Sequence, residues 1–463
     1  MFPSLSERRK IGSWSLSQKI KPSLIFFYLL ILFLPTQFGK HFWPGFSYVY
    51  GIRTDYLSPT LYLTDIFIVL IFITFVIEIF REKKLYLSSK KIKTYFLKLF
   101  ITGLFFLILV IGVLKSHNPY AGLYGLAKIL EYLFLFSYTA KSFRKLSGLI
   151  LFSSFIIGIV SESVLAIAQY INQGSIGGAL YFLGERSFNS QTPGVANASI
   201  NGQLILRPYA TFPHPNVLAA YIFIFMALTI LFIKHGFLNS KKIILLPVLV
   251  LGSFALLLTM SRTVLVAWGV VLVFLLSHSF LKKTRIDLKK KINFKIGTDK
   301  ILIVLFFLIC IFSFILPIGP RFSQLNFSDQ TVVQREILIK DSIVMFYRQP
   351  VFGVGLNNFL INLPDVQKQQ KESLYIQPVH NIFLLIVSQA GILVFTLFLY
   401  FLIKTYIRIK DNKDSGLLVL FISVLFLGFF DHYFLTLQQG QLIFTILFGI
   451  FWSNSKKDDK IKI

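Results

Sequence analysis

The stretch KKIILLPVLVLGSFALLLTMSRTVLVAWGVVLVFLLSHSFLKK, residues 241–283, decides the class of this protein. A lysine pair stands at each end, and the apolar residues between the pairs suffice for two helices. Each helix is long enough to cross a hydrocarbon layer of about 30 Å. Because lysines hold loops on one side of a membrane, we expect two crossings and a turn at 261–263 on the opposite side.

Apolar segments of this kind recur through all 463 residues. Hydrophobic residues make up 55% of the chain and charged residues only 14%, too few to cover the surface of a soluble protein. The sequence therefore predicts an all-α polytopic membrane protein, a single integral membrane domain over 1–463 with about twelve transmembrane helices. The predicted segments are 23–39, 61–80, 96–114, 121–140, 147–171, 215–234, 243–260, 263–281, 301–319, 380–402, 415–434 and 437–453.

The net charge of +27 would suit a nucleic-acid-binding protein, but its distribution argues against one. The basic residues lie between the apolar segments, and 34 of the 47 fall in every second connection or at the termini. This is the positive-inside pattern of cytoplasmic loops. We therefore expect a multi-pass protein of the cytoplasmic (inner) membrane with both termini in the cytoplasm, with the lipid bilayer and no nucleic acid as partner.

The same orientation places the two longest connections, 172–214 and 320–379, on the external side. The second lies between predicted helices nine and ten, and within it residues 331–348 predict an amphipathic helix that ends before Pro350. A transporter built from two halves usually has its largest loop at the centre, on the cytoplasmic side. Large external loops instead favour chemistry at the outer membrane surface.

Arg262 is the most informative single residue, because the predicted turn places it at the external membrane boundary without a carboxylate nearby in the sequence. An arginine there costs several kcal/mol unless it is paired or hydrated. One interpretation is an interfacial arginine that reaches lipid phosphate. The other is a bidentate clamp for a ligand phosphate, to which the planar guanidinium is suited.

A second group of polar residues comes directly before the predicted helix at 215–234, in RPYATFPHPNVLAAY, residues 207–221. Pro215 suits the first turn of a helix, and ordinary capping is one interpretation of Asn216. Capping requires neither Arg207 nor His214. We therefore expect Arg207 to share a polyanion with Arg262, and His214 and Asn216 to contact substrate.

A histidine opens the predicted helix at 380–402, in QPVHNIFLLIVSQAGILVF, residues 377–395. A neutral imidazole is a natural general base near neutral pH, so His380 is the candidate catalytic base. The alternative is a helix cap. Asn381 is a candidate for orienting substrate, with bonds to the loop backbone as the alternative.

The external loop adds Arg335, a candidate substrate contact, and the run PVFGVGLNNF at 350–359, whose glycines permit close backbone approach to a ligand. Lys128 and Glu131 are spaced to neutralise each other on one helix. Glu162 and Asp431 lie in predicted membrane spans and should face the interior. The sequence contains no Cys/His or acidic pattern with metal-ligand spacing, so no metal and no cofactor are expected.

Four stretches together resemble the O-antigen ligase and O-antigen polymerase superfamily of bacterial envelope proteins. They are RPYATFPHPN (207–216), SRT (261–263), the run from Arg335 through PVFGVGLNNF (335–359) and HNIFLLIVSQAG (380–391). The resemblance implies a bundle like the C-type glycosyltransferase folds and a metal-independent reaction on glycans linked to undecaprenyl diphosphate. Arg207 and Arg262 would hold the diphosphate, and His380 would deprotonate the acceptor hydroxyl. The family often has Glu where this chain has Gln389, and His214 remains a rival base.

We therefore expect a membrane glycosyltransferase that joins an undecaprenyl-diphosphate-linked glycan to a glycan or lipid acceptor at the outer face of the membrane. The sequence leaves open whether it is a ligase or a polymerase. A transporter or flippase for a lipid-linked oligosaccharide is the alternative from another class. A flippase needs binding residues that are reachable from both sides, whereas these candidates all lie externally. A non-catalytic envelope assembly protein is a third possibility.

Overall fold

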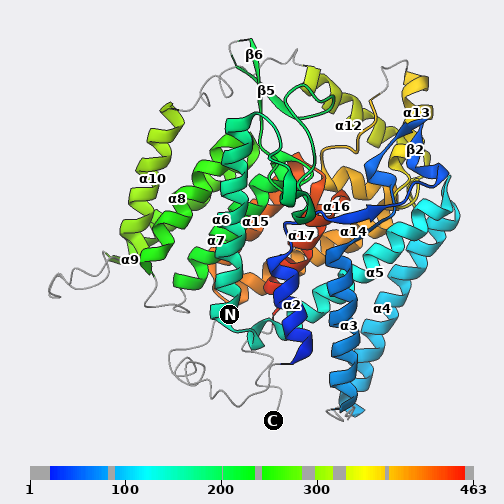
Figure 1. Ribbon diagram of the computed structural model, residues 1–463. Helices are drawn as coiled ribbons and strands as arrows, with labels where there is room; N and C mark the ends of the chain where they lie inside the picture. Colours follow the sequence, from blue (N-terminus) through cyan, green and yellow to red (C-terminus); the bar gives the residue numbers. More distant parts are fainter. Residues whose placement is uncertain are drawn as a thin grey trace.

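The computed structural model describes residues 21–81, 89–200, 202–234, 242–283, 298–315, 330–370 and 375–453. Several basic segments that set the expected orientation, among them 1–20, 284–297 and 454–463, lie outside these residues. Within the described ranges the chain is mostly helical, and its long helices run side by side as a bundle (Figure 1).

Every predicted membrane segment contains a helix. In chain order these helices are α2 (Pro22–Leu32), α3 (Leu63–Arg81), α4 (Ser89–Leu114), α5 (Pro119–Ser142), α6 (Gly148–Asn172), α7 (Pro215–Lys234), α8 (Lys242–Leu258), α9 (Arg262–Lys283), α10 (Thr298–Ile315), α14 (Ile382–Asp411), α15 (Ser415–Phe430) and α17 (Gln438–Trp452). By length and apolar composition, four of them can cross a membrane, namely α3, α6, α7 and α14, and several of the others are shorter apolar helices. The predicted class, a helical polytopic membrane protein, is confirmed.

Two predicted segments are longer than the helices that form in them. Helix α2 ends at Leu32 instead of residue 39, shortly before Pro35, which cannot donate a helical hydrogen bond. Helix α15 ends at Phe430 because Asp431 adopts an extended conformation, and the short helix α16 (Tyr433–Thr436) follows. Hydropathy alone did not predict either break, because the residues on both sides are apolar.

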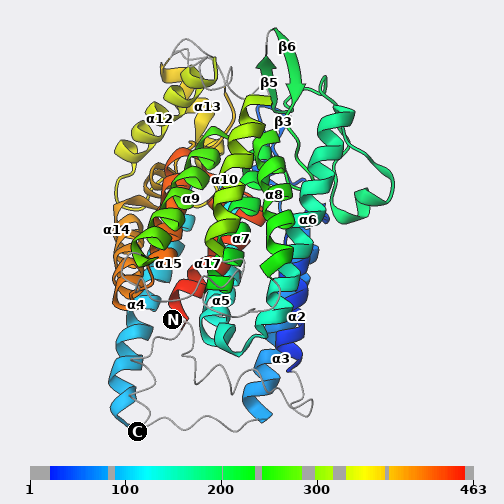
Figure 2. The same ribbon diagram turned by 90° about the vertical axis from the view of Figure 1, so that its left-hand side faces the viewer.

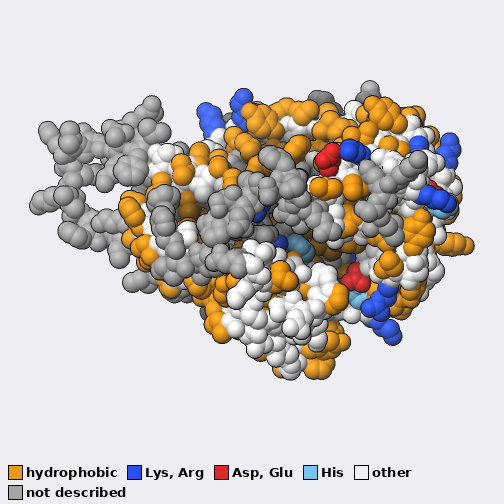
Figure 3. Space-filling view, turned by 90° about the horizontal axis from the view of Figure 1, so that it is seen from above, with side chains coloured by type: hydrophobic (Ala, Val, Ile, Leu, Met, Phe, Trp, Pro, Cys, Tyr) orange, Lys and Arg blue, Asp and Glu red, His pale blue; other side chains and the backbone are white. Residues whose placement is uncertain are grey.

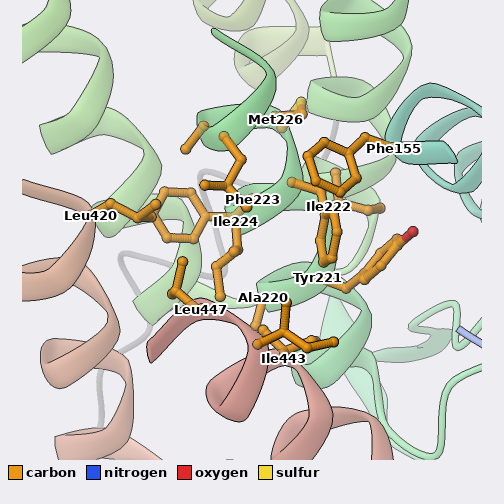
Figure 4. Close-up of a cluster of buried hydrophobic side chains, with 14 of the residues drawn as sticks. Phe155, Ala220, Tyr221, Ile222, Phe223, Ile224, Met226, Leu420, Ile443 and Leu447 are labelled. Atoms are coloured by element: carbon orange, nitrogen blue, oxygen red, sulfur yellow. The ribbon is translucent and has the colours of Figure 1, made fainter. Parts of the chain in front are cut away.

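The core of the bundle is built around α7. Every residue of its apolar window is buried, as expected for a helix that is hydrophobic on all sides. Its side chains pack against residues from α6, α15 and α17, including Phe155, Leu420 and Ile443 (Figure 4). In contrast, α3 exposes a row of apolar side chains such as Phe72 and Phe80, which suits contact with lipid.

One end of the bundle carries the long connections, and we call it the loop face. Connection 172–214 forms the 3-10 helix η4 (Gly178–Leu183) and a hairpin of β5 (Asn197–Ile200) and β6 (Gln203–Leu206). The other connection contains α12 (Gln330–Arg348), which confirms the helix predicted at 331–348, and α13 (Phe359–Gln370). Both views show these elements together at this end (Figures 1 and 2).

Small strands also form at the loop face between α2 and α3, where the sequence analysis predicted no strand. Strands β1 (Gly39–His41) and β4 (Thr60–Tyr62) pair antiparallel, as do β2 (Tyr48–Val49) and β3 (Ile52–Arg53). Two 3-10 turns, η1 (Gly45–Ser47) and η2 (Asp55–Leu57), join them.

The glycines of PVFGVGLNNF make a close contact with α14, which is kinked at Gly391 (φ 74°). The loop fills the kink, since Val354 N–H donates to the Ser388 carbonyl and Gly355 N–H to the Gln389 carbonyl, both at 2.9 Å. A Cβ on Gly353 would lie 2.4 Å from the Gln389 backbone. The close backbone approach predicted for this run is therefore to a helix of the same chain.

Candidate active site

Three breaks in the helical pattern bring polar residues together at the loop face. The first is the turn before α7, which begins at Pro215 as predicted. The second is the start of α14, which Asn381 caps. The third is the break between α15 and α16 at 431–432. Figure 3 looks onto this face and shows histidine and basic side chains set back near its centre.

Arg207 joins the first of these regions to the turn between α8 and α9, and it is only 7% exposed. Its Nε donates to the carbonyl of Thr259 at 2.7 Å, in the turn between α8 and α9. Its Nη2 donates to Asn216 Oδ1 at 2.6 Å, in the first turn of α7. The guanidinium is therefore fixed between the α8–α9 turn and the α7 start.

Asn216 continues this contact to an acidic residue. Its Nδ2 donates to Asp431 Oδ2 at 2.8 Å. The other oxygen of Asp431 accepts the N–H of His432 at 2.8 Å and lies 3.4 Å from His380 Nδ1. Arg207 and His380, predicted as separate site residues, are thus joined through Asn216 and Asp431.

Arg262 is the first residue of α9, directly after the turn in which Met260 has a φ of 51°. The carbonyl of Thr259, three residues earlier, accepts a hydrogen bond from Arg207, so both arginines lie at the turn between α8 and α9. Among the described residues, the buried Nε of Arg262 has no hydrogen-bond partner. A buried donor without a partner is costly, and a ligand oxygen that reached this nitrogen would offset that cost.

His214 lies in the turn before α7, where its Nδ1 accepts the N–H of Asn216 at 3.1 Å. This bond places the ring proton on Nε2. Burial, and after it the positive charge of Arg207, lowers the pKa of His214 to about 3, and Arg335 acts in the same direction. The electrostatic effect of Arg335 indicates that α12 brings this exposed arginine close to the site.

Asn381 has its amide occupied by the protein backbone. Its Oδ1 accepts the N–H groups of Phe383 at 2.8 Å and Leu384 at 3.0 Å, and its Nδ2 donates to the Phe429 carbonyl at 3.0 Å. These bonds satisfy two donors at the start of α14 and tie that start to the end of α15. Bonds to the backbone were the alternative to a substrate contact for Asn381, and the structure contains such bonds as a cap of α14.

A possible metal-ligand set is formed by His380, Asp431 and His432, each of which offers an atom within 4.8 Å of the others. The sequence analysis found no such set, because His380 and Asp431 are 51 residues apart. Both oxygens of Asp431 already accept protein hydrogen bonds, from Asn216 and from the backbone of His432. The arrangement therefore needs no ion to satisfy the carboxylate.

Asp431 and His432 are the site residues that the sequence analysis did not assign. Asp431 was expected only as an acidic residue in a membrane span that should face the interior, and no role was expected for His432. The available signal was the adjacent acid and histidine at 431–432 inside an apolar segment, the kind of intramembrane polar group that marks function. His432 is 3% exposed, its ring lies 4.9 Å from that of His380, and its Nδ1 is 2.6 Å from Thr436 Oγ1.

The site thus joins Arg207 to the pair of His380 and Asp431 through Asn216. Residues 247–399 match the family model of O-antigen ligase. The predicted resemblance is thereby confirmed over this range. No curated protein matches the chain. The O-antigen ligase region includes Arg262, Arg335 and His380, whereas Arg207 and Asp431 lie on either side of it.

Proposed function

We propose that the chain is a glycosyltransferase that moves a glycan from undecaprenyl diphosphate to a glycan or lipid acceptor. The proposal includes about twelve membrane-spanning helices in a C-type glycosyltransferase bundle, a single membrane domain over 1–463 and cytoplasmic termini. With this orientation, the loop face and its site lie at the outer membrane surface. The match of residues 247–399 to O-antigen ligase supports the reaction class.

The charge of the candidate site carries the proposal. Arg207, Arg262 and Arg335 bring three positive charges to the loop face, and among the described contacts Asn216 joins one carboxylate, Asp431, to Arg207. The excess of positive charge fits a diphosphate, and guanidinium groups bind phosphate oxygens in pairs. In the reaction, the bond between the sugar's anomeric carbon and the diphosphate oxygen breaks. The arginines then stabilise the charge that develops on the leaving undecaprenyl diphosphate.

His380 is the proposed general base. If its Nδ1–H points to Asp431, its Nε2 carries the free lone pair, and the carboxylate both orients the ring and stabilises the imidazolium that forms. The 3.4 Å separation is long for a hydrogen bond, but such bonds often tighten when substrate binds. The acceptor hydroxyl would lose its proton to His380 Nε2 as its oxygen attacks the anomeric carbon.

His214 is less suited to the same role. Its unprotonated nitrogen already accepts the N–H of Asn216, so the nitrogen that remains carries a proton. A neutral Nε2–H can instead donate to a phosphate or sugar oxygen. We therefore propose that His214 is a substrate contact, together with Arg335, and that His380 is the base.

Product analysis on the purified protein tests the proposal. The full-length chain in detergent or liposomes, incubated with undecaprenyl-diphosphate-linked glycan and an acceptor, should release undecaprenyl diphosphate and form a product with a new glycosidic bond. The variant His380→Gln is the matched control. Donor movement across the bilayer of sealed liposomes, without release of undecaprenyl diphosphate, would replace the proposal with a flippase.

A further inference from the structure

The segment between Arg207 and His214 is held by side chains of α6, a helix outside the region that matches O-antigen ligase. Gln169 Oε1 accepts the N–H of Tyr209 at 3.0 Å and that of Ala210 at 2.7 Å. Glu162 Oε2 accepts the next N–H, that of Thr211, at 3.1 Å. Three consecutive backbone donors are therefore bound by two side chains of one helix.

The conformation of this segment requires such support. Ala210 has a φ of 49°, in the left-handed region that residues with a Cβ rarely adopt. The turn also buries its backbone, since Ala210 is 1% and Thr211 3% exposed. Without Glu162 and Gln169, three buried N–H groups would have no acceptor, each at a cost comparable to a lost hydrogen bond.

Additional contacts fix the two α6 side chains. Gln169 Nε2 donates to Glu185 Oε1 at 2.7 Å and to the Ala210 carbonyl at 3.1 Å. The Thr211 hydroxyl lies 2.9 Å from Glu162 Oε2 and 3.0 Å from the Pro35 carbonyl. Glu162 is 5% exposed and Gln169 is fully buried. A carboxylate this deep in a membrane helix is expensive, and its recorded bonds all lead to the turn.

We propose that Glu162 and Gln169 are positioning residues that fix the 209–211 turn and thereby place Arg207 for the donor diphosphate. The inference rests on the proposed function, in which Arg207 binds that diphosphate. Arg207 lies two residues before the turn. The backbone conformation of the turn therefore sets where Arg207 lies relative to its partners Thr259 and Asn216. The N-terminal helices therefore contribute to donor binding without contacting the donor.

The test is a double-mutant cycle on the full-length protein, with the affinity for undecaprenyl-diphosphate-linked glycan as the readout. Glu162→Ala should weaken donor binding roughly tenfold, the equivalent of one or two lost hydrogen bonds. Glu162→Gln, whose amide oxygen can accept the same two bonds, should restore most of the affinity. In the presence of Arg207→Lys, Glu162→Ala should have little further effect, because both changes remove the same contact.

Ser154→Ala is the matched control, because Ser154 is also buried on α6 but its hydroxyl donates only within its own helix, to Ile150. It should leave donor affinity unchanged. If Glu162→Ala does not fold, Thr211→Val takes its place in the cycle. That variant removes the hydroxyl that donates to Glu162 and keeps the backbone N–H of residue 211. The positioning role would be overturned if the losses of donor affinity from Glu162→Ala and Arg207→Lys multiplied fully in the double variant. It would also be overturned if Glu162→Gln bound donor as weakly as Glu162→Ala. If Arg207→Lys alone binds donor normally, the proposed diphosphate site itself is wrong.

Discussion

Two polar clusters lie towards the loop face, and their charges differ in sign. The first is the candidate site with Arg207, Arg262, Arg335 and Asp431. The second, which we call the lysine cluster, consists of Asp65, Lys128 and Glu131. Lys128 Nζ lies 2.9 Å from Asp65 Oδ2 and 2.9 Å from Glu131 Oε2. The first cluster has an excess of positive charge, whereas the second has two carboxylates for one ammonium.

Neighbouring side chains hold the lysine cluster, although Glu131 Oε1 is buried without a hydrogen-bond partner among the described residues. Gln438 Nε2 donates to Asp65 Oδ1 and, at 3.1 Å, to Thr64 Oγ1, while its Oε1 accepts from Tyr132 at 2.6 Å. The predicted pair of Lys128 and Glu131 is confirmed, and Asp65 is an addition from a distant helix. These contacts join α3, α5 and α17, so the cluster serves packing. The candidate site instead has a cationic excess, and its buried atom without a partner among the described residues is a donor, Arg262 Nε.

The comparison teaches that burial and charge alone do not identify a binding site in this bundle. Both clusters contain charged side chains that are costly to bury. Each leaves one buried polar atom without a partner among the described residues, Arg262 Nε in the first and Glu131 Oε1 in the second. Their difference lies in the excess charge: the cationic excess of the candidate site suits an anionic ligand, whereas the contacts of the lysine cluster join three helices. Changes at the candidate site should therefore affect ligand binding and turnover, while changes in the lysine cluster should affect folding.

The largest expected effect is at His380. His380→Gln keeps a polar side chain but removes the proton-accepting nitrogen, so turnover should fall by about 10² to 10⁴, the scale of a general base. Donor affinity should remain near normal, because the arginines are intact. Separate measurements of glycan transfer and donor binding check this. Near-normal transfer by His380→Gln together with complete loss in His214→Ala would move the base to His214.

The next effect concerns stability. Lys128→Met leaves Asp65 and Glu131 buried without their cation, and breaking a buried ion pair in this way costs about 3–5 kcal/mol. The thermal unfolding midpoint in detergent should fall clearly, while the folded fraction binds donor normally. Lys340→Met, which removes a half-exposed lysine paired with Glu336 on α12, is the control and should change stability little. Loss of donor binding without loss of stability would contradict the packing role.

A smaller effect is expected for lysine substitutions at Arg207 and Arg262. An ammonium cannot reproduce the planar fork of the guanidinium, and each lost charge-assisted bond is worth about 1.5–3 kcal/mol. Donor affinity or transfer should therefore fall roughly ten- to hundredfold for each variant. Wild-type behaviour of both lysine variants would mean that the two arginines do not clamp a diphosphate.

The smallest effect is expected from removal of metal ions. Both oxygens of Asp431 are hydrogen-bonded by the protein. In the proposed reaction, arginines stabilise the charge on the leaving diphosphate, a role that a metal ion has in other enzymes. Transfer should continue unchanged in excess EDTA. A loss that added Mg²⁺ or Zn²⁺ reverses would instead assign a catalytic ion to His380, Asp431 and His432.

Much of the site was predictable because its signals are local. Arg262 stands in a turn between two apolar segments, Pro215 starts a helix, and His380 precedes one, so each position follows from its neighbours in the sequence. For Asn381, bonds to the backbone were also among the alternatives. The GxG run was predicted to allow close approach, but the identity of its partner, the kinked α14, depends on residues more than thirty positions away.

By itself, the sequence determined that this is a helical membrane protein, where its helices lie and which arginines and histidines deserve attention. These features depend on hydropathy and on charge between segments, both of which act locally. Only the tertiary structure joined Arg207 to Thr259 across 52 residues, His380 to Asp431 across 51 and Lys128 to Asp65 on another helix. Such contacts depend on how the apolar helices pack against one another. That packing is decided by the shapes and hydrogen bonds of many side chains at once.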